Sequence, residues 1–188
     1  MTIPTGRYQP VPVSGEAFRA TLGDPLLLSF FDYWSARRAP GRLPGRQDID
    51  PIEMRPWLKH LVLADVVDGK RLRYRLAGTE MVERWGADFT GRFLEDVMSG
   101  TYLEYIATLY WTVVRRGAPV MSSSRFRWDL RRAAMTRRLI VPLARDGRTV
   151  DMTMSCQVFD TNVEPAGVGR RLDDAEREDL PSYVEAEG

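Results

Sequence analysis

The chain has 188 residues, 44% hydrophobic and 28% charged, a composition typical of a folded globular protein. Its formal net charge is only +1, which excludes a global electrostatic attraction to nucleic acid or to membranes. No apolar run reaches the roughly 18 residues that a membrane-spanning helix needs.

Residues 1–23 are predicted to be an N-terminal extension. Prolines within residues 1–15 favour an extended or irregular chain, and a short helix is expected from Glu16 to Leu22. The N-terminus lacks the basic-then-apolar layout of a secretory signal, so we expect a cytoplasmic protein.

A stronger, amphipathic helix is predicted after the extension. Asp24-Pro25 supplies an N-cap residue and a first-turn proline, and Pro40-Gly41 ends the helix. Its apolar residues fall at helical spacing on one face, which must be buried against the sheet or against another subunit. We take this face as the candidate dimer or partner surface, formed by Leu27, Phe30, Phe31 and Trp34.

The next segments predict a short helix and then a hairpin. Asp50-Pro51 repeats the helix start signal, with Glu53 at the capping-box position, and this helix should end near Lys59. Two strands follow, joined by the turn dipeptide Asp68-Gly69. The second strand alternates Leu72, Tyr74 and Leu76 with arginines, and a short helix bearing Met81, Val82 and Trp85 comes next.

The second half of the chain predicts one long helix and three strands. The helix runs from Tyr102 to Arg116 and is apolar around most of its circumference. Strands are expected over residues 120–128, 136–144 and 150–159. In the last strand Met152, Met154 and Cys156 share one face. Residues 161–188 are acidic and are predicted to form a short helix or a loose tail.

This order of elements resembles a PAS domain over residues 24–160. More narrowly, the chain resembles a bacterial family of short proteins that consist mainly of one PAS domain. The residues that carry the resemblance are Tyr33-Trp34, Asp48-Ile49-Asp50-Pro51, the segment Tyr74 to Thr79, Thr90-Gly91, and Val141-Pro142-Leu143 with Asp146-Gly147. None is a catalytic signature; we expect them to form caps, turns and strand-to-helix junctions.

The resemblance implies an α+β fold: a five-stranded antiparallel sheet with helices over one face. It also implies a sensory or regulatory module that binds a small ligand, a protein partner or both, and that signals through protein-protein contacts. A homodimer or a signalling-protein partner is expected. The sequence does not identify the ligand.

A pocket for a small apolar ligand is expected between the sheet and the helices. The alternative is that the same side chains simply fill the core, because no sequence pattern marks a void. The candidate pocket residues are Tyr74, Leu76, Trp85, Tyr105, Leu109, Met152 and Met154.

Cofactor and catalytic signatures are missing. One cysteine and one histidine exclude a multi-Cys or His-rich metal site. Cys156 lies on the last strand rather than on the short helices where a flavin adduct forms, and His60 lies outside the helix that usually supplies the haem ligand. We therefore expect no metal, flavin or haem, and no enzyme, since only a lone acid such as Asp65 or Asp151 remains as a catalytic candidate.

Two arginine patterns leave an alternative function open. The segment 125–138 packs six arginines around Phe126 and Trp128, which suits a nucleotide or nucleic-acid binding module. Strand alternation favours a simpler interpretation, with the aromatics facing the core and the arginines facing water. Arg71 and Arg75 also match the RxxxR pattern of cyclic-dinucleotide receptors, but the companion motif is missing.

Overall fold

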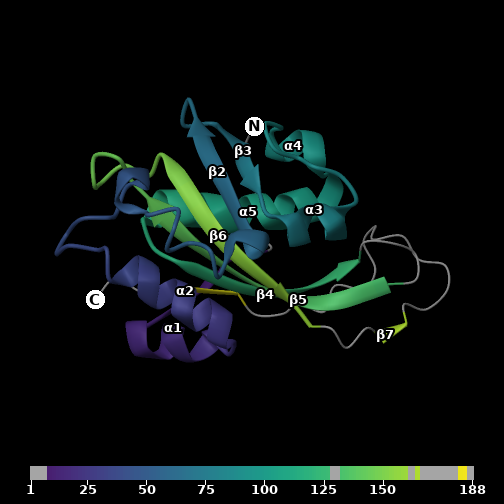
Figure 1. Ribbon diagram of the computed structural model, residues 1–188, viewed down its shortest axis with the longest axis horizontal. Helices are drawn as coiled ribbons and strands as arrows, with labels where there is room; N and C mark the ends of the chain where they lie inside the picture. The colour runs from purple at the N-terminus through teal and green to yellow at the C-terminus, as the bar shows by residue number, and fades with distance from the viewer. Residues whose placement is uncertain (1–7, 128–131, 161–163, 166–181, 186–188) are drawn as a thin grey trace.

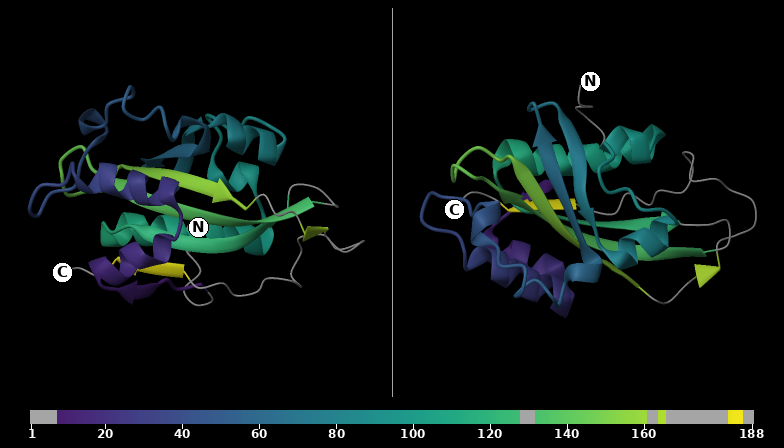
Figure 2. Two further views of the ribbon diagram at one scale, coloured as in Figure 1. Left: turned by 60° about the horizontal axis from the view of Figure 1, so that its bottom comes forward. Right: turned by 45° about the horizontal axis from the view of Figure 1, so that its top comes forward.

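We describe a computed structural model that covers residues 8–127, 132–160, 164–165 and 182–185 (Figure 1). The protein is an α+β fold in three layers. A twisted sheet forms the middle layer. Helices α1 (Gly15–Leu22) and α2 (Pro25–Ser35) cover one face of it, and α3 (Thr79–Trp85), α4 (Leu94–Val97) and α5 (Gly100–Arg116) cover the other (Figure 2).

Within the described residues the sheet has eight strands. Seven follow the order β1-β8-β4-β5-β6-β2-β3, and β7 pairs with β5. Every pair is antiparallel except β1 with β8. The strands are β1 (Val11–Val13), β2 (Leu61–Val67), β3 (Arg71–Ala77), β4 (Val120–Arg127), β5 (Arg132–Leu143), β6 (Met152–Phe159), β7 (Glu164–Pro165) and β8 (Ser182–Glu185).

The five strands expected from the sequence are adjacent in this sheet, in the order β3-β2-β6-β5-β4, with β3 at its edge. Strands from both halves of the chain lie side by side in one sheet, since β2 pairs with β3 on one edge and with β6 on the other. The expected strand number was wrong, since β8 and β1 extend the sheet beyond β4. These two strands lie in the segments that we expected to fall outside the domain.

The expectation of helices over one face was also wrong, because both faces are covered. The α2 core lies between α1, α2 and the sheet and includes Phe30, Trp34 and Met154. The α5 core lies between α3, α4, α5 and the sheet and includes Tyr74 and Leu109. A sheet buried on both sides needs two helical layers, and the N-terminal helices supply the second.

A β-bulge explains why β3 contributes to both cores. Leu63 pairs with Leu76, but the next residue, Ala64, pairs with Tyr74, so Arg75 is one residue in excess. The extra residue reverses the alternation of side chains. Tyr74 therefore faces the α5 core, whereas Leu76 packs against the α2 core.

The segment predicted as a short helix after Asp50 consists of turns and a 3-10 helix, η2 (Leu58–His60). The Asp50 side chain accepts a hydrogen bond from the Ile52 backbone amide at 2.8 Å, as a cap would. Glu53 does not complete a capping box, because its carboxylate pairs with Arg37. Pro56 removes a backbone donor, which opposes a regular helix here.

Candidate functional site

A small cavity lies in the α5 core, between the sheet and helices α3, α4 and α5. Its volume is about 30 Å³, enough for about two water molecules. Most of its lining is apolar or aromatic, and a few polar groups converge on it. The lining residues are Val62, Tyr74, Met81, Trp85, Phe89, Val97, Met98, Tyr102, Ile106, Tyr110, Arg138 and Gln157.

A buried polar row crosses the sheet beneath this cavity. Ser122 of β4 pairs with Arg138 of β5, which pairs with Gln157 of β6. Residues directly opposite in antiparallel strands share one face. The Arg138 Nε donates to the Gln157 Oε1 at 2.9 Å, and the Gln157 Nε2 donates to the Thr136 Oγ1 at 2.7 Å. These bonds hold the guanidinium in one orientation at the cavity wall.

The polar row is not fully paired. The Nη1 of Arg138 and the Oγ of Ser122 are buried and have no hydrogen-bond partner. Arg138 is only 5% exposed, and no Asp or Glu of the described residues forms an ion pair with it. Buried charges in proteins are normally paired. Arg138 is thus an exception that stability alone does not explain.

The charge of Arg138 is permanent. Burial lowers the pKa of its guanidinium, but the surrounding tyrosine oxygens, chiefly that of Tyr102, raise it by more, and the pKa ends above its ordinary value. Burial also raises the pKa of Tyr74 and of Tyr110, so both phenols stay neutral. The Tyr110 hydroxyl lies 3.3 Å from the Ser155 Oγ. The site therefore presents one fixed cation among neutral groups.

Aromatic rings from β3, α3, α5 and the segment between α3 and α4 form much of the cavity wall. Tyr74 and Phe89 meet edge to face at 4.7 Å between ring centroids. Trp85 stacks on Tyr102 at 6.4 Å and meets Phe89 at 6.3 Å. Such packing offers an apolar, aromatic surface beside a charge.

The cover of the cavity is built from short elements joined by glycines. Helices α3 and α4 have 7 and 4 residues. Gly86, Gly91 and Gly100 flank them with positive φ angles of 81°, 84° and 61°, and none has an atom within 4 Å of where a Cβ would lie. This cover segment, residues 79–100, is tied to β3 by backbone hydrogen bonds between Gly91 and Tyr74 and between Tyr74 and Arg92, while its glycines leave open space around their Cα atoms.

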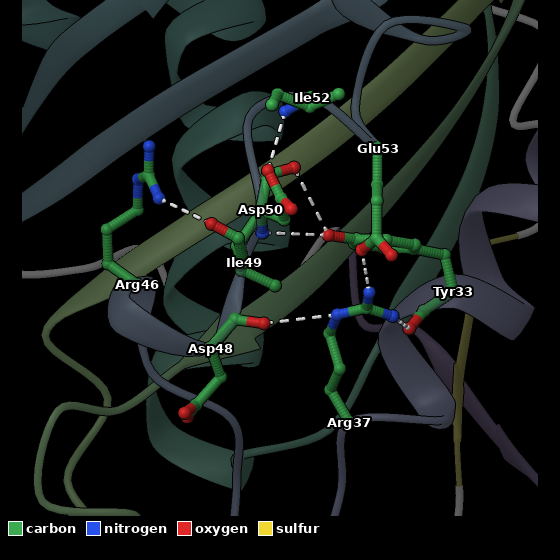
Figure 3. Close-up of polar contacts among 8 residues, drawn as sticks. All are labelled: Tyr33, Arg37, Arg46, Asp48, Ile49, Asp50, Ile52 and Glu53. Carbon is green, nitrogen blue, oxygen red and sulfur yellow. Dashed lines mark hydrogen bonds and ion pairs between the residues drawn. The ribbon is translucent and has the colours of Figure 1, made fainter.

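A second set of polar contacts lies at the opposite side of the sheet, where α2 ends (Figure 3). The Asp50 backbone amide donates to the Tyr33 Oη at 3.0 Å. Arg37 donates to the Asp48 carbonyl at 3.1 Å and to the Tyr33 carbonyl at 2.8 Å, and it pairs with Glu53. These contacts tie α2 to the segment leading into β2. The residues form a corner of the fold, as expected.

A larger groove of about 590 Å³ lies on the surface, lined by four arginines and Glu185. The arginines of this groove are exposed, so water solvates their charge, whereas Arg138 is buried. Their charge therefore needs no bound counter-ion. The arginines are Arg38, Arg42, Arg116 and Arg148.

A family model described as a PAS domain matches residues 24–157. The chain belongs to the PAS domain family. The match spans α2 to β6, which includes the cavity, the polar row and the corner at Tyr33. No protein of curated function matches the chain.

The candidate pocket residues of the PAS domain fall into three groups. Tyr74 and Trp85 line the cavity. Tyr105 and Leu109 belong to the α5 core but do not line it.

Leu76, Met152 and Met154 lie on the opposite face, in the α2 core, so their assignment to the pocket was wrong. The apolar face of β6 was assumed to face the pocket; α2 covers it instead, and the polar face of β6 lines the cavity.

The predicted partner surface was wrong as well. Leu27, Phe30 and Trp34 are fully buried and Phe31 is 7% exposed, all inside the α2 core. The Trp34 Nε1 donates to the Pro142 carbonyl at 2.9 Å. The apolar face of α2 is therefore buried against the sheet and not against another subunit.

The sequence interpretation missed Tyr102, Tyr110, Arg138 and Gln157. Arg138 was grouped with the solvated arginines, whereas strand alternation puts it in phase with the buried residues Thr136 and Ile140. This position on the buried face of the strand was the signal in the sequence that could have identified Arg138 as a core residue. Tyr102 and Tyr110 could not be distinguished as cavity residues, because α5 is apolar around most of its circumference and many of its residues could be buried.

The remaining sequence candidates lie away from the cavity. Cys156 is buried in the α2 core, where burial raises the pKa of its thiol. Burial lowers the pKa of His60, the last residue of η2. Among the described residues no three metal-binding side chains cluster, and no helix is long and apolar enough to cross a membrane.

The arginine patterns are only partly described. Arg137 is exposed and donates to the Gly23 carbonyl at 2.9 Å, whereas Arg138 is buried. The side chains of residues 125–134, with Phe126 and Trp128, lie outside the described part. In the RxxxR segment Arg71 pairs with Glu95, and Arg73 and Arg75 lie near Asp65 at 3.4 and 3.6 Å.

Proposed function

We propose that this PAS domain is a sensory module that binds a small ligand in the cavity beneath α5. One observation carries the proposal: a cavity in the α5 core that is lined by a buried polar side chain with an unpaired atom. Buried polar groups in a core that serves stability alone are satisfied by protein or water. In a ligand-binding pocket, by contrast, a buried polar group can lack a partner until the ligand binds.

We propose that the cover segment, residues 79–100, passes ligand occupancy to the protein surface. It lines the cavity through Met81, Trp85 and Met98, and its three left-handed glycines let the short helices shift as units. A ligand that prefers one position of the cover shifts the population of the surface it forms. A second copy of the chain or another signalling protein would read that surface; the homodimer expected from the sequence stays a prediction.

A pocket-blocking variant tests the proposal. Met98 is partly buried at the cavity wall, so Met98→Trp should fill the space. The matched control is Leu58→Trp, which adds the same ring at a 43% exposed position away from the cavity. In a thermal-shift screen of metabolites we expect compounds that stabilise the wild type and Leu58→Trp but not Met98→Trp.

Hydrogen exchange tests whether the cover segment responds to ligand binding. A bound compound should slow exchange in residues 79–100 more than in α2, because the cover segment lines the cavity and α2 does not. The ligand proposal fails when no compound stabilises the wild type, or when Met98→Trp responds as strongly as the control. Unchanged exchange in residues 79–100 on binding would contradict the role of the cover.

The alternative function, nucleotide or nucleic-acid binding through residues 125–138, has less support from the described residues. Arg138, which the alternative needs at the surface, is 5% exposed. Arg137 is engaged with the Gly23 carbonyl.

A further inference from the structure

We propose that the ligand of this cavity is a small monocarboxylate, bound through its carboxylate to Arg138. The inference rests on the proposed ligand-sensing function and specifies the chemistry of the same site. It follows from the charge, the geometry and the size of the cavity.

The charge of the site calls for an anion. Arg138 is buried at the cavity wall, its Nη1 has no partner, and no described carboxylate pairs with it. A guanidinium cannot lose its proton to escape this situation. A bound anion would supply the missing counter-charge and accept the free Nη1–H.

The geometry favours a carboxylate. The Arg138 Nε is occupied by Gln157, so the guanidinium is oriented before any ligand arrives. The Ser122 hydroxyl is also unpaired and belongs to the residue directly opposite Arg138 in the sheet, but Ser122 is not among the lining residues of the cavity. The free Nη1–H lies in the plane of the guanidinium at the cavity wall, where an oxygen of a planar carboxylate can accept it.

A single negative charge is the best match. Arg138 is the one cation among the lining residues of this cavity, all of which are described, and Tyr74 and Tyr110 are neutral. A phosphate dianion would leave one charge without a partner in a buried site, where that is costly.

The rest of the ligand should be short and apolar. Trp85, Phe89 and Tyr74 supply an aromatic part of the same cavity wall that Arg138 and Gln157 line. The volume of about 30 Å³ holds about two waters, so only a short chain fits with the cover in place. A ring-sized group requires residues 79–100 to move outward.

Matched pairs of probes test the charge requirement without any mutation. The probes are sodium acetate, propionate and benzoate, each compared with its primary amide, which has the same shape and no charge. Chloride at equal concentration controls for general anion effects. We expect at least one carboxylate to raise the melting temperature and to bind by calorimetry, and its amide to bind roughly tenfold more weakly or worse.

A pair of variants at adjacent positions tests the residue. Arg138→Met removes the buried charge and keeps an unbranched apolar side chain, while Arg137→Met removes the exposed neighbour on the other face. Arg137→Met should bind the carboxylate as the wild type does, and Arg138→Met should lose the response. Without ligand, Arg138→Met should melt close to the wild type, because removal of the unpaired buried charge offsets the loss of the hydrogen bond from Arg138 to Gln157.

The outcomes separate the two proposals. If amides bind as well as carboxylates, or if neutral metabolites bind at Met98 while no carboxylate does, the monocarboxylate inference is wrong and ligand sensing stands. If no probe and no metabolite binds, both are wrong. A large fall in the melting temperature of ligand-free Arg138→Met, with no response of the wild type to carboxylates, would make Arg138 a structural residue.

Discussion

Gly78 marks the closest backbone approach at the start of α3. A Cβ at this position would lie 2.4 Å from the Leu58 carbonyl oxygen and 2.5 Å from that of Lys59. Its φ of −66° is ordinary, so the need for glycine comes from space and not from backbone strain. The approach brings η2 against α3 and so fixes one end of the cover segment.

We predict that Gly78→Ala destabilises the protein by about 1–3 kcal/mol, since backbone atoms must move to admit the methyl group. The control is Gly15→Ala at the first turn of α1, where the nearest atom to the new Cβ is 3.4 Å away. That change should be neutral or stabilise by up to about 1 kcal/mol. Urea denaturation measures both, and equal stability of the two variants would contradict the close approach.

At the scale of elements, β8 decides how the sheet ends. It pairs antiparallel with β4 and parallel with β1, so it covers an edge of β4 that would otherwise be open to other chains. Val184 of β8 is fully buried in the α5 core. A strand distant in sequence from the family match is therefore part of the hydrophobic core.

We predict that Val184→Ala lowers the free energy of unfolding by about 2–3 kcal/mol through lost burial and a new cavity. Val11→Ala, on the adjacent strand β1 at 52% exposure, should change it by less than about 0.5 kcal/mol. Chemical denaturation of both proteins checks the difference. A small effect of Val184→Ala would mean that β8 docks loosely on β4.

At the scale of the whole molecule, the two cores share one sheet. Leu139 and Val141 of β5 face the α2 core, and Ile140 between them faces the α5 core. Loss of either helical layer exposes one face of the same strands. The two cores should therefore unfold together.

We predict that α2 and α5 lose protection in one transition. Pulsed hydrogen exchange across a urea titration should give the same midpoint for peptides from both helices. Peptides from residues 79–100 serve as the comparison and should exchange at lower urea. Earlier loss of α2 would show that the N-terminal layer is an independent unit.

Local features of the fold were determined by the sequence. The Asp68-Gly69 turn has positive φ at both residues, 51° and 63°, as its dipeptide predicts. Asp24 caps α2, accepting a hydrogen bond from the Leu26 amide at 2.8 Å. The central strands and α5 follow from alternation and helical spacing, because these patterns depend only on neighbouring residues.

Tertiary structure decided which face of each strand lines the cavity. Alternation in β6 separates Met154 from Gln157 but does not say which of the two faces meets α5, since either face can be covered by a helix. The bulge at Arg75 reverses the pattern again, and a single extra residue leaves little trace in the sequence. The burial of Arg138 depends on β4, β6 and α5 together. Only the assembled layers could show that its charge lies in the core without a partner.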